Sequence, residues 1–406
     1  MRQDRIRPNP RCTCLLPILL ILSPAQSLTA GQDSSGGASS EWRPETVEKG
    51  IVILVGFPDL SHNVDRSFVQ MRFSRQLNSY VREMSYNTVS LDVAVTEKWY
   101  MMPNPVGQYR ISPRNLEVDR SRVRRLINDA INAVDREVDF SRYSFAVIFM
   151  GAQLTDYGMI GLCGYPGMLG WSSQDIPKTT HGQPIRGGVA IFCYQAHLGT
   201  LFHDIAHILG GLKDGARMVP CLYDHDLQAR PGPLRETAVN AMVNMGFWDP
   251  MSCHFVKMGV PPPGLSSWTR MRLNWIDPAK IKVVGPGQKT EVVLGPLEDG
   301  SCATLVVKIP VSETTYYLIE NRQPIGCDRI LPESGVLIMY ADDRIAECRQ
   351  GRTPVRLMNA DPSVPHLEGA AFDTGRKGTF LDSQNGISVQ LEEKTGSSYR
   401  ILVSRR

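Results

Sequence analysis

Two histidines four residues apart, His203 and His207, are the side chains in this sequence whose spacing most directly indicates chemistry. Apolar residues surround them throughout the stretch 199–209, which predicts a helix. Residues four apart on a helix leave the same face one turn apart, and that spacing suits two imidazole ligands of one zinc ion. The sequence therefore predicts a zinc site on this helix.

Asp204 directly follows the first of these histidines. In zinc hydrolases with an HExxH motif, a glutamate at this position acts as the general base. Aspartate carries the same carboxylate on a side chain shorter by one methylene. We therefore interpret Asp204 as a candidate general base and the site as hydrolytic.

Gly210 and Gly211 follow the predicted helix. Glycine readily adopts the left-handed conformation with which many helices end, so this pair predicts a stop. The chain can then turn back toward the metal. We expect a third ligand to come from that return.

The N-terminus has the pattern of a secretory signal. Arginines precede a short apolar run, residues 14–22, and small residues follow it up to Ala30. The run is too short to span a bilayer. We predict cleavage after Ala25 or Ala30, preferring Ala30, and a secreted or extracytoplasmic protein with a signal peptide at 1–30 and a Gly/Ser-rich flexible lead-in at 31–45.

Removal of the signal also removes the basic excess of the chain. Residues 1–30 hold Asp4 and four arginines, which account for the whole formal net charge of +3. A near-neutral mature chain gives no indication of nucleic-acid binding, and no membrane contact is expected after cleavage.

Seven of the nine cysteines lie beyond this segment. In an oxidising compartment we expect up to three disulfides and one cysteine left over. Proximity in sequence favours pairing Cys163 with Cys193 and Cys327 with Cys348, although sequence alone does not fix connectivity.

The expected fold class is α+β, with a catalytic domain at 46–278 and an all-β, sandwich-like domain at 279–406. Buried strands are predicted at 51–57, 145–150 and 188–194, helices at 67–83 and 120–138, an alternating strand at 89–100, and a glycine-rich loop at 161–188. Because the third buried strand leads directly into the histidine helix, a peptide-binding cleft at a sheet edge is expected there. Beyond residue 280, short β-type runs recur with turn residues between them.

Taken in order, these segments resemble the secreted metallopeptidases of the immune inhibitor A family, whose catalytic domain is zincin-like. The resemblance rests on FPD at 57–59, YVREMSYNTVSL followed by EKWY, the HDxxHxxG variant of HExxHxxGxxD, GFWDPMSCH, PPPGLSSWTRMRLNWI, LIENRQ and PESGVLIMYADD. It covers most of the mature chain. It implies a zinc-dependent endopeptidase that acts on proteins or peptides.

The resemblance also implies roles for single residues. His203 and His207 would ligate zinc, Asp204 would replace the glutamate, and Met251 would lie in a turn beneath the metal. Trp248 and Asp249 are interpreted as shaping that turn. For Asp224 and Asp226 the alternatives are a calcium site and an exposed, solvated loop. The histidines His197, His225 and His254 are interpreted as structural.

The third ligand departs from the family pattern, because Lys213 stands where an aspartate is expected. Asp214 would serve through a loop longer by one residue. Alternatively, KDGARMV is an insertion and Cys221 occupies the ligand position. Both side chains can bind zinc. We favour Asp214, since Cys221 requires a longer excursion and could form a disulfide, for example with Cys253.

Three functions are consistent with these observations. The leading hypothesis is a secreted zinc endopeptidase, slow because Asp204 is short. The alternative is a catalytically silent relative that acts as a binding or structural protein. A zinc hydrolase for substrates other than peptides is the third.

Overall fold

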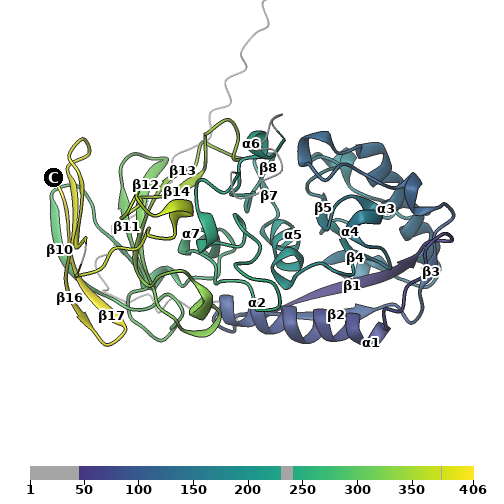
Figure 1. The fold of residues 1–406 in the computed structure, drawn as a ribbon, viewed down its shortest axis with the longest axis horizontal. Helices are drawn as coiled ribbons and strands as arrows, with labels where there is room; N and C mark the ends of the chain where they lie inside the picture. The colour runs from purple at the N-terminus through teal and green to yellow at the C-terminus, as the bar shows by residue number, and fades with distance from the viewer. Residues whose placement is uncertain (1–44, 230–240, 376) are drawn as a thin grey trace, which may run out of the picture. The chain divides into compact units, whose positions relative to one another are not determined.

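The computed structural model describes residues 45–229, 241–375 and 377–406, which belong to one compact unit (Figure 1). The predicted signal peptide and the lead-in up to residue 44 lie outside the described residues. Helices and several sheets occur together, so the expected α+β class is confirmed.

The first half of the chain is built on a six-stranded central sheet. Its strand order is β2-β1-β4-β6-β5, and β3 pairs with the end of β1. All neighbours are parallel except β5, which runs antiparallel to β6 at the edge. The strands are β1 (Thr46–Gly56), β2 (Val89–Val95), β3 (Tyr100–Met101), β4 (Phe145–Met150), β5 (Gly161–Tyr165) and β6 (Val189–Cys193).

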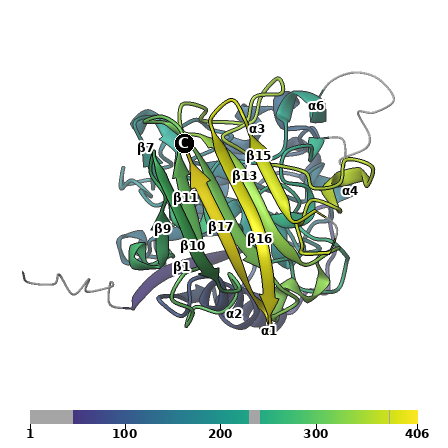
Figure 2. The same ribbon diagram turned by 90° about the vertical axis from the view of Figure 1, so that its left-hand side faces the viewer.

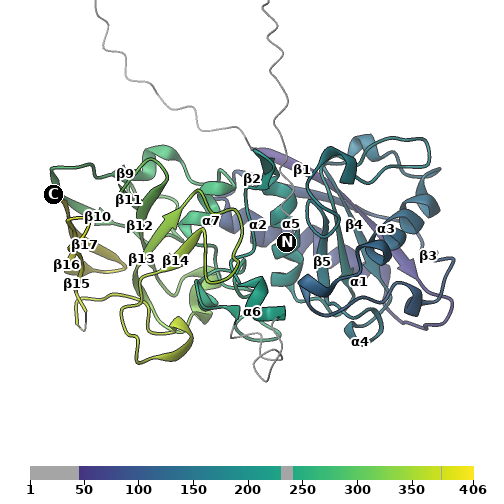
Figure 3. The same ribbon diagram turned by 90° about the horizontal axis from the view of Figure 1, so that it is seen from above.

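Helices cover both faces of this sheet. On one face lies α3 (Arg120–Val134), which begins at the N-cap Asp119 and buries its apolar side. The other face carries α5 (Leu198–Gly210) and a continuous helical segment. That segment consists of α1 (Arg66–Met71), a π-helical stretch (Arg72–Leu77) and α2 (Asn78–Met84). Figures 1 and 3 show α5 and α3 on opposite sides of β4 and β5.

The last third of the chain forms two sheets. One has the order β14-β13-β12-β11-β9 and the other β10-β17-β16-β15 (Figure 2), and side chains from both share one apolar core. The strands are β9 (Ile281–Val283), β10 (Gln288–Leu294), β11 (Val306–Pro310), β12 (Thr315–Arg322), β13 (Gly335–Asp342), β14 (Val355–Leu357), β15 (Thr379–Asp382), β16 (Ile387–Thr395) and β17 (Ser398–Arg405).

The central strands of the five-stranded sheet, β12 and β13, are buried on both faces. Every residue of β12 is buried, because its outer face packs into the same apolar core as α5 and the central sheet. Buried side chains on both sides of residue 278, such as Trp268 and Leu318, belong to that core. The expected boundary therefore does not divide the apolar core.

Shorter elements connect these layers. They include α4 (Leu154–Tyr157), the hairpin of β7 (Leu212–Lys213) and β8 (Ala216–Arg217), α6 (His225–Ala229) and α7 (Ser267–Arg272). Among the described residues, no helix combines the length and apolar character needed to cross a bilayer.

The expectation of a loop throughout residues 161–188 is wrong. The glycine-rich stretch 161–188 contains strand β5, although GLCGY has few residues that favour strands. Pairing with β6 supplies the order that the local sequence does not. The cleft hypothesis required β6 to be the edge strand beside α5. Instead, β5 occupies that edge.

Candidate metal centre

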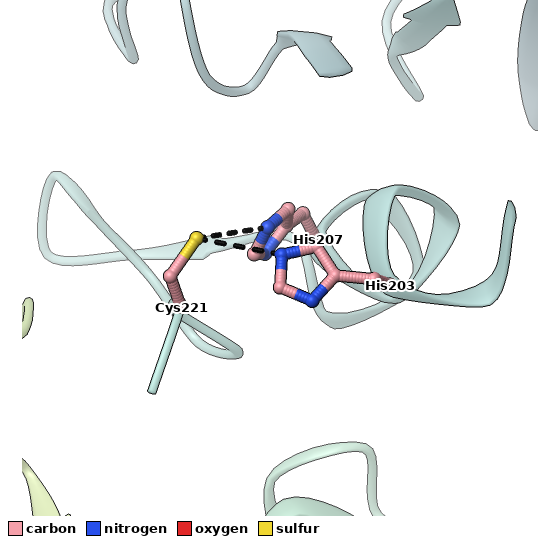
Figure 4. Close-up of side chains that lie close together, drawn as sticks. All are labelled: His203, His207 and Cys221. Atoms are coloured by element: carbon pink, nitrogen blue, oxygen red, sulfur yellow. Dashed lines mark hydrogen bonds between the residues drawn. The ribbon is translucent and has the colours of Figure 1, made fainter. Parts of the chain in front are cut away.

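The two histidines of α5 leave the helix toward the sulfur of Cys221 (Figure 4). The Cys221 sulfur lies 3.5 Å from Nε2 of His203 and 3.5 Å from Nε2 of His207. All three side chains are buried. Among the described residues, they form the only group of three or more His, Cys, Asp or Glu side chains close enough to hold a metal ion.

Backbone carbonyls fix both imidazoles. Nδ1 of His203 donates to the carbonyl of Pro250 at 3.0 Å, and Nδ1 of His207 donates to the carbonyl of Val219 at 2.7 Å. A carbonyl only accepts, so Nδ1 carries the proton and Nε2 presents its lone pair to Cys221. Metal-binding histidines are typically held in this way.

Glycine permits one of these contacts. A Cβ at Gly210, the last residue of α5, would lie 2.7 Å from the side chain of Val219. Without it the returning chain packs directly against the helix and brings its carbonyl to His207. The next residue, Gly211, has φ of 65° and ends the helix as predicted.

The distances fit a tetrahedral metal site. Zinc binds imidazole nitrogen at about 2.0–2.1 Å and thiolate sulfur at about 2.3 Å, so tetrahedral ligands of these types are about 3.6 Å apart. Both sulfur–nitrogen distances agree with that value. The donor set is also one that zinc accepts.

Cys221, and not Asp214, is the third member of the group. Asp214 has φ of 52° and is exposed in the turn between β7 and β8. The residues KDGARMV form a hairpin that projects before the chain returns, so the returning segment and not the hairpin reaches the histidines. The preference for Asp214 therefore disagrees with this structure, and the insertion hypothesis agrees with it.

His203, His207 and Cys221 line a cavity with a volume of about 150 Å³. Asp204, on the same helix as the histidines, lines it too. Its side chain is 5% exposed, and its Oδ2 atom has no hydrogen-bond partner. Burial raises the pKa of this carboxyl well above its usual value, and the nearby Cys221 raises it further. One buried carboxylate oxygen is thus free beside the histidines.

Electrostatics keeps the two imidazoles neutral. Burial lowers the pKa of His203 and of His207 to about 3. For Cys221, burial raises the pKa of the thiol, but its interaction with the adjoining His207, which includes a hydrogen bond, and the positive charge of Arg217 outweigh burial and leave the pKa well below its usual value. Neutral imidazoles and a thiol that ionises readily are the forms that bind metal.

Two further histidines line the cavity. The ring of His254 lies 4.2 Å from that of His203, centroid to centroid, and Nδ1 of His254 is 3.1 Å from the hydroxyl of Thr200. His225 contacts the amide of Asn115 at 3.1 Å and the carboxylate of Glu347 at 3.5 Å. His197, by contrast, caps α5 by accepting from Gly199 and is structural, as expected.

The sequence analysis did not identify three other residues that line the cavity, Arg217, Tyr223 and Glu347. The ring of Tyr223 stacks on that of His203 at 5.8 Å, and its hydroxyl accepts from Asn115 at 2.7 Å. Arg217 and Glu347 pair at 2.8 Å, although 130 residues separate them. Only the proximity of Arg217 and Tyr223 to Cys221 in the sequence could have drawn attention to them.

Met251 is fully buried in a turn whose carbonyl at Pro250 holds His203. Asp249 shapes this turn, as expected, because its carboxylate accepts from the backbone of Met251 and from Ser266 and Thr269. Arg322 of β12 donates to the carbonyl of Trp248 at 3.0 Å. The C-terminal sheets therefore support the turn that orients a histidine.

Protein donors occupy the carboxylates of Asp224 and Asp226. Asp224 is fully buried and accepts from backbone N–H groups of residues 226, 227 and 351. Asp226 pairs with Arg349 at 3.0 Å. This arrangement gives no support to a calcium site. The alternative of an exposed, solvated loop is wrong for Asp224, which is buried.

The seven described cysteines are free thiols, so the expected pairings do not occur in this structure. Cys163 and Cys193 belong to the cores on opposite faces of the central sheet and cannot meet. Cys327 contacts Glu83, and Cys348 contacts Thr353. Cys253 donates to the carbonyl of Phe255 and does not bond to Cys221.

No protein-family model matches this chain, and a search of curated proteins finds no similar sequence.

Proposed function

We propose that this protein is a zinc-dependent hydrolase that cleaves peptide bonds. His203, His207 and Cys221 would hold the ion, and Asp204 would act as the general base. The observation that carries the proposal is the convergence of three ligand atoms and one unpartnered carboxylate oxygen in a single cavity. Three protein ligands are characteristic of catalytic zinc sites, which keep one position open.

When bound, zinc supplies such a site with a Lewis acid and with a hydroxide-like nucleophile at neutral pH. The chain supplies proton transfer. Asp204 would accept a proton as water adds to the carbonyl carbon and would return it to the leaving nitrogen as the C–N bond breaks. Its free Oδ2 atom beside the histidines suits this role.

The edge of the central sheet supports a peptide as the substrate. Among the described strands β5 pairs only with β6, and the N–H groups of Met168 and Leu169 donate to its carbonyls at Cys163 and Gly164, so only the start of the strand is left for pairing with another chain. Residues 161–163 of this strand line the metal cavity. An extended peptide could add to such an edge by backbone hydrogen bonds and present its carbonyl to the cavity.

The sequence resemblance to the immune inhibitor A family supports the same proposal and assigns the first half of the chain to a zincin-like domain. A mixed sheet with an antiparallel edge strand beside a histidine-bearing helix is consistent with that assignment.

A second candidate is a metal-binding protein without turnover. The observation that favours it is Asp204, which is a methylene shorter than glutamate and only 5% exposed. A carboxylate misplaced by about 1.5 Å, one C–C bond, can lose roughly a hundredfold in rate.

The deciding experiment is cleavage of a quenched fluorescent peptide library by the purified protein, with and without 1,10-phenanthroline. The proposal predicts slow cleavage that the chelator abolishes and added zinc restores. Bound zinc without any cleavage would favour the second candidate.

A further inference from the structure

The guanidinium of Arg217 is fixed beside the sulfur of Cys221. Arg217 is the last residue of β8, in the inserted hairpin, and is 8% exposed. Its Nε and Nη2 atoms donate to one oxygen of Glu347 at 2.9 and 2.8 Å. The ring of Trp171 lies 5.0 Å from its central carbon. Held in this way, Nη2 points at the sulfur from 3.8 Å.

This contact places a permanent positive charge next to the only anionic ligand of the candidate site. Arginine does not lose its proton in proteins, so the charge does not depend on pH. A thiolate donates more electron density to a metal than a neutral imidazole does, which weakens the metal as a Lewis acid. Hydrogen bonds and charges around a ligating sulfur are known to oppose that donation.

A simple structural ion pair does not require this arrangement. Burying an arginine and a carboxylate costs desolvation energy that their attraction often fails to repay. Both Arg217 donors bond to the same Glu347 oxygen, Oε1, while Oε2 has no hydrogen-bond partner and lies 3.5 Å from Nε2 of His225. Glu347 thus holds the guanidinium in the orientation in which Nη2 faces the sulfur of Cys221.

We propose that Arg217 is a positioning residue for the Cys221 ligand: anchored by Glu347, it orients the sulfur and offsets part of the charge that the thiolate donates to the metal. This inference rests on the proposed metal site. It extends that proposal by assigning the inserted hairpin a function, since the hairpin supplies the arginine four residues before the cysteine.

Cobalt(II) provides the test, because a sulfur-to-cobalt charge-transfer band reports directly on the thiolate. Full-length protein without its signal is loaded with cobalt(II), and the near-ultraviolet band is compared between wild type and Arg217→Met. We expect the variant to bind one ion and its band to move to lower energy, since the thiolate loses the charge that stabilises it. Zinc affinity is expected to fall about 10- to 100-fold, as for other partners of metal ligands.

Arg349→Met is the matched control. Arg349 lines the same cavity but pairs with Asp226, and its side chain is 48% exposed. Its removal should leave the band at the wild-type energy. If Arg217→Met does not fold, Arg217→Gln gives the same test with an uncharged polar side chain. Arg217→Lys restores the charge and should lie nearer to wild type than Arg217→Gln.

An unchanged band in a folded, cobalt-loaded Arg217→Met or Arg217→Gln variant would overturn the inference. Identical bands for the Lys and Gln variants would refute the role of charge. Failure of the wild type to bind cobalt(II) would overturn both this inference and the metal site. Cobalt bound through sulfur without peptide cleavage would contradict only the proposed peptidase function.

Discussion

The sulfur of Cys221 lies 3.5 Å from Nε2 of His207, although fourteen residues and a β-hairpin separate the two in sequence. That relationship favours Cys221 over Asp214 as the third candidate ligand. The hairpin turns Asp214 into solvent, and the segment after it returns to the helix.

The ligand assignment predicts opposite results for two substitutions. Cys221→Ser should lose zinc, with an affinity lower by at least about tenfold, since even partners of metal ligands contribute that much. Asp214→Ala should keep zinc, because its side chain is exposed and lies outside the group. Zinc titration of the two purified variants measures both. Zinc kept by Cys221→Ser and lost by Asp214→Ala would restore the one-residue loop extension as the better alignment.

The general-base role of Asp204 predicts a loss of turnover at constant metal content. Asp204→Asn keeps the shape of the side chain but removes its basicity, so peptide cleavage should fall by at least about a hundredfold, the lower range for a general base. Zinc content should not change. Asp204→Glu should also keep zinc, and its turnover should rise if the cavity accepts the added methylene. An Asp204→Asn variant as active as wild type would exclude this role.

Arg322 connects the C-terminal sheets to the turn at Trp248, and its loss should destabilise the fold. It is fully buried and bonds Asp328 at 2.6 Å, Gly264 at 2.8 Å and Trp248 at 3.0 Å. Arg322→Met should lower the free energy of unfolding by about 3–5 kcal/mol, because it leaves buried carboxylates without their cation. Urea denaturation checks this value. Arg344→Met, which removes an exposed pair with Asp342, should leave the unfolding midpoint unchanged.

The predicted signal peptide calls for a direct test. N-terminal sequencing of exported protein should begin at Gln26 or Gly31, where small residues precede the cleaved bond. Exported, soluble protein that still begins with Met1 would refute cleavage.

Elements with strong periodicity could be predicted from sequence. FAVIFM forms β4 at the predicted residues, and the histidine helix differs from its prediction by one residue at each end. Beyond residue 280 one of the expected β-type runs, TYYLIENR, forms β12. These segments carry their burial pattern locally. The sequence of β5 has no such pattern, because the strand forms through its pairing with β6.

The candidate site, like the fold, could be predicted only where the local sequence determines the structure. Helix geometry alone places His203 and His207 on one face, so their proximity followed from spacing. The third member depended on how a loop returns, and loop closure differs too little in free energy between the two candidates to choose between them. Glu347 comes from a loop beyond β13 and could only be found once the fold brought it to Arg217.

The most direct test of the account is the zinc content of the purified, signal-free protein and of its His207→Ala variant, measured by mass spectrometry. The account predicts one zinc ion per chain in the wild type and none in the variant, with circular dichroism unchanged because the β-sheets do not depend on this side chain. A wild type without stoichiometric zinc, or a variant that retains it, would contradict the metal centre on which the proposed function depends.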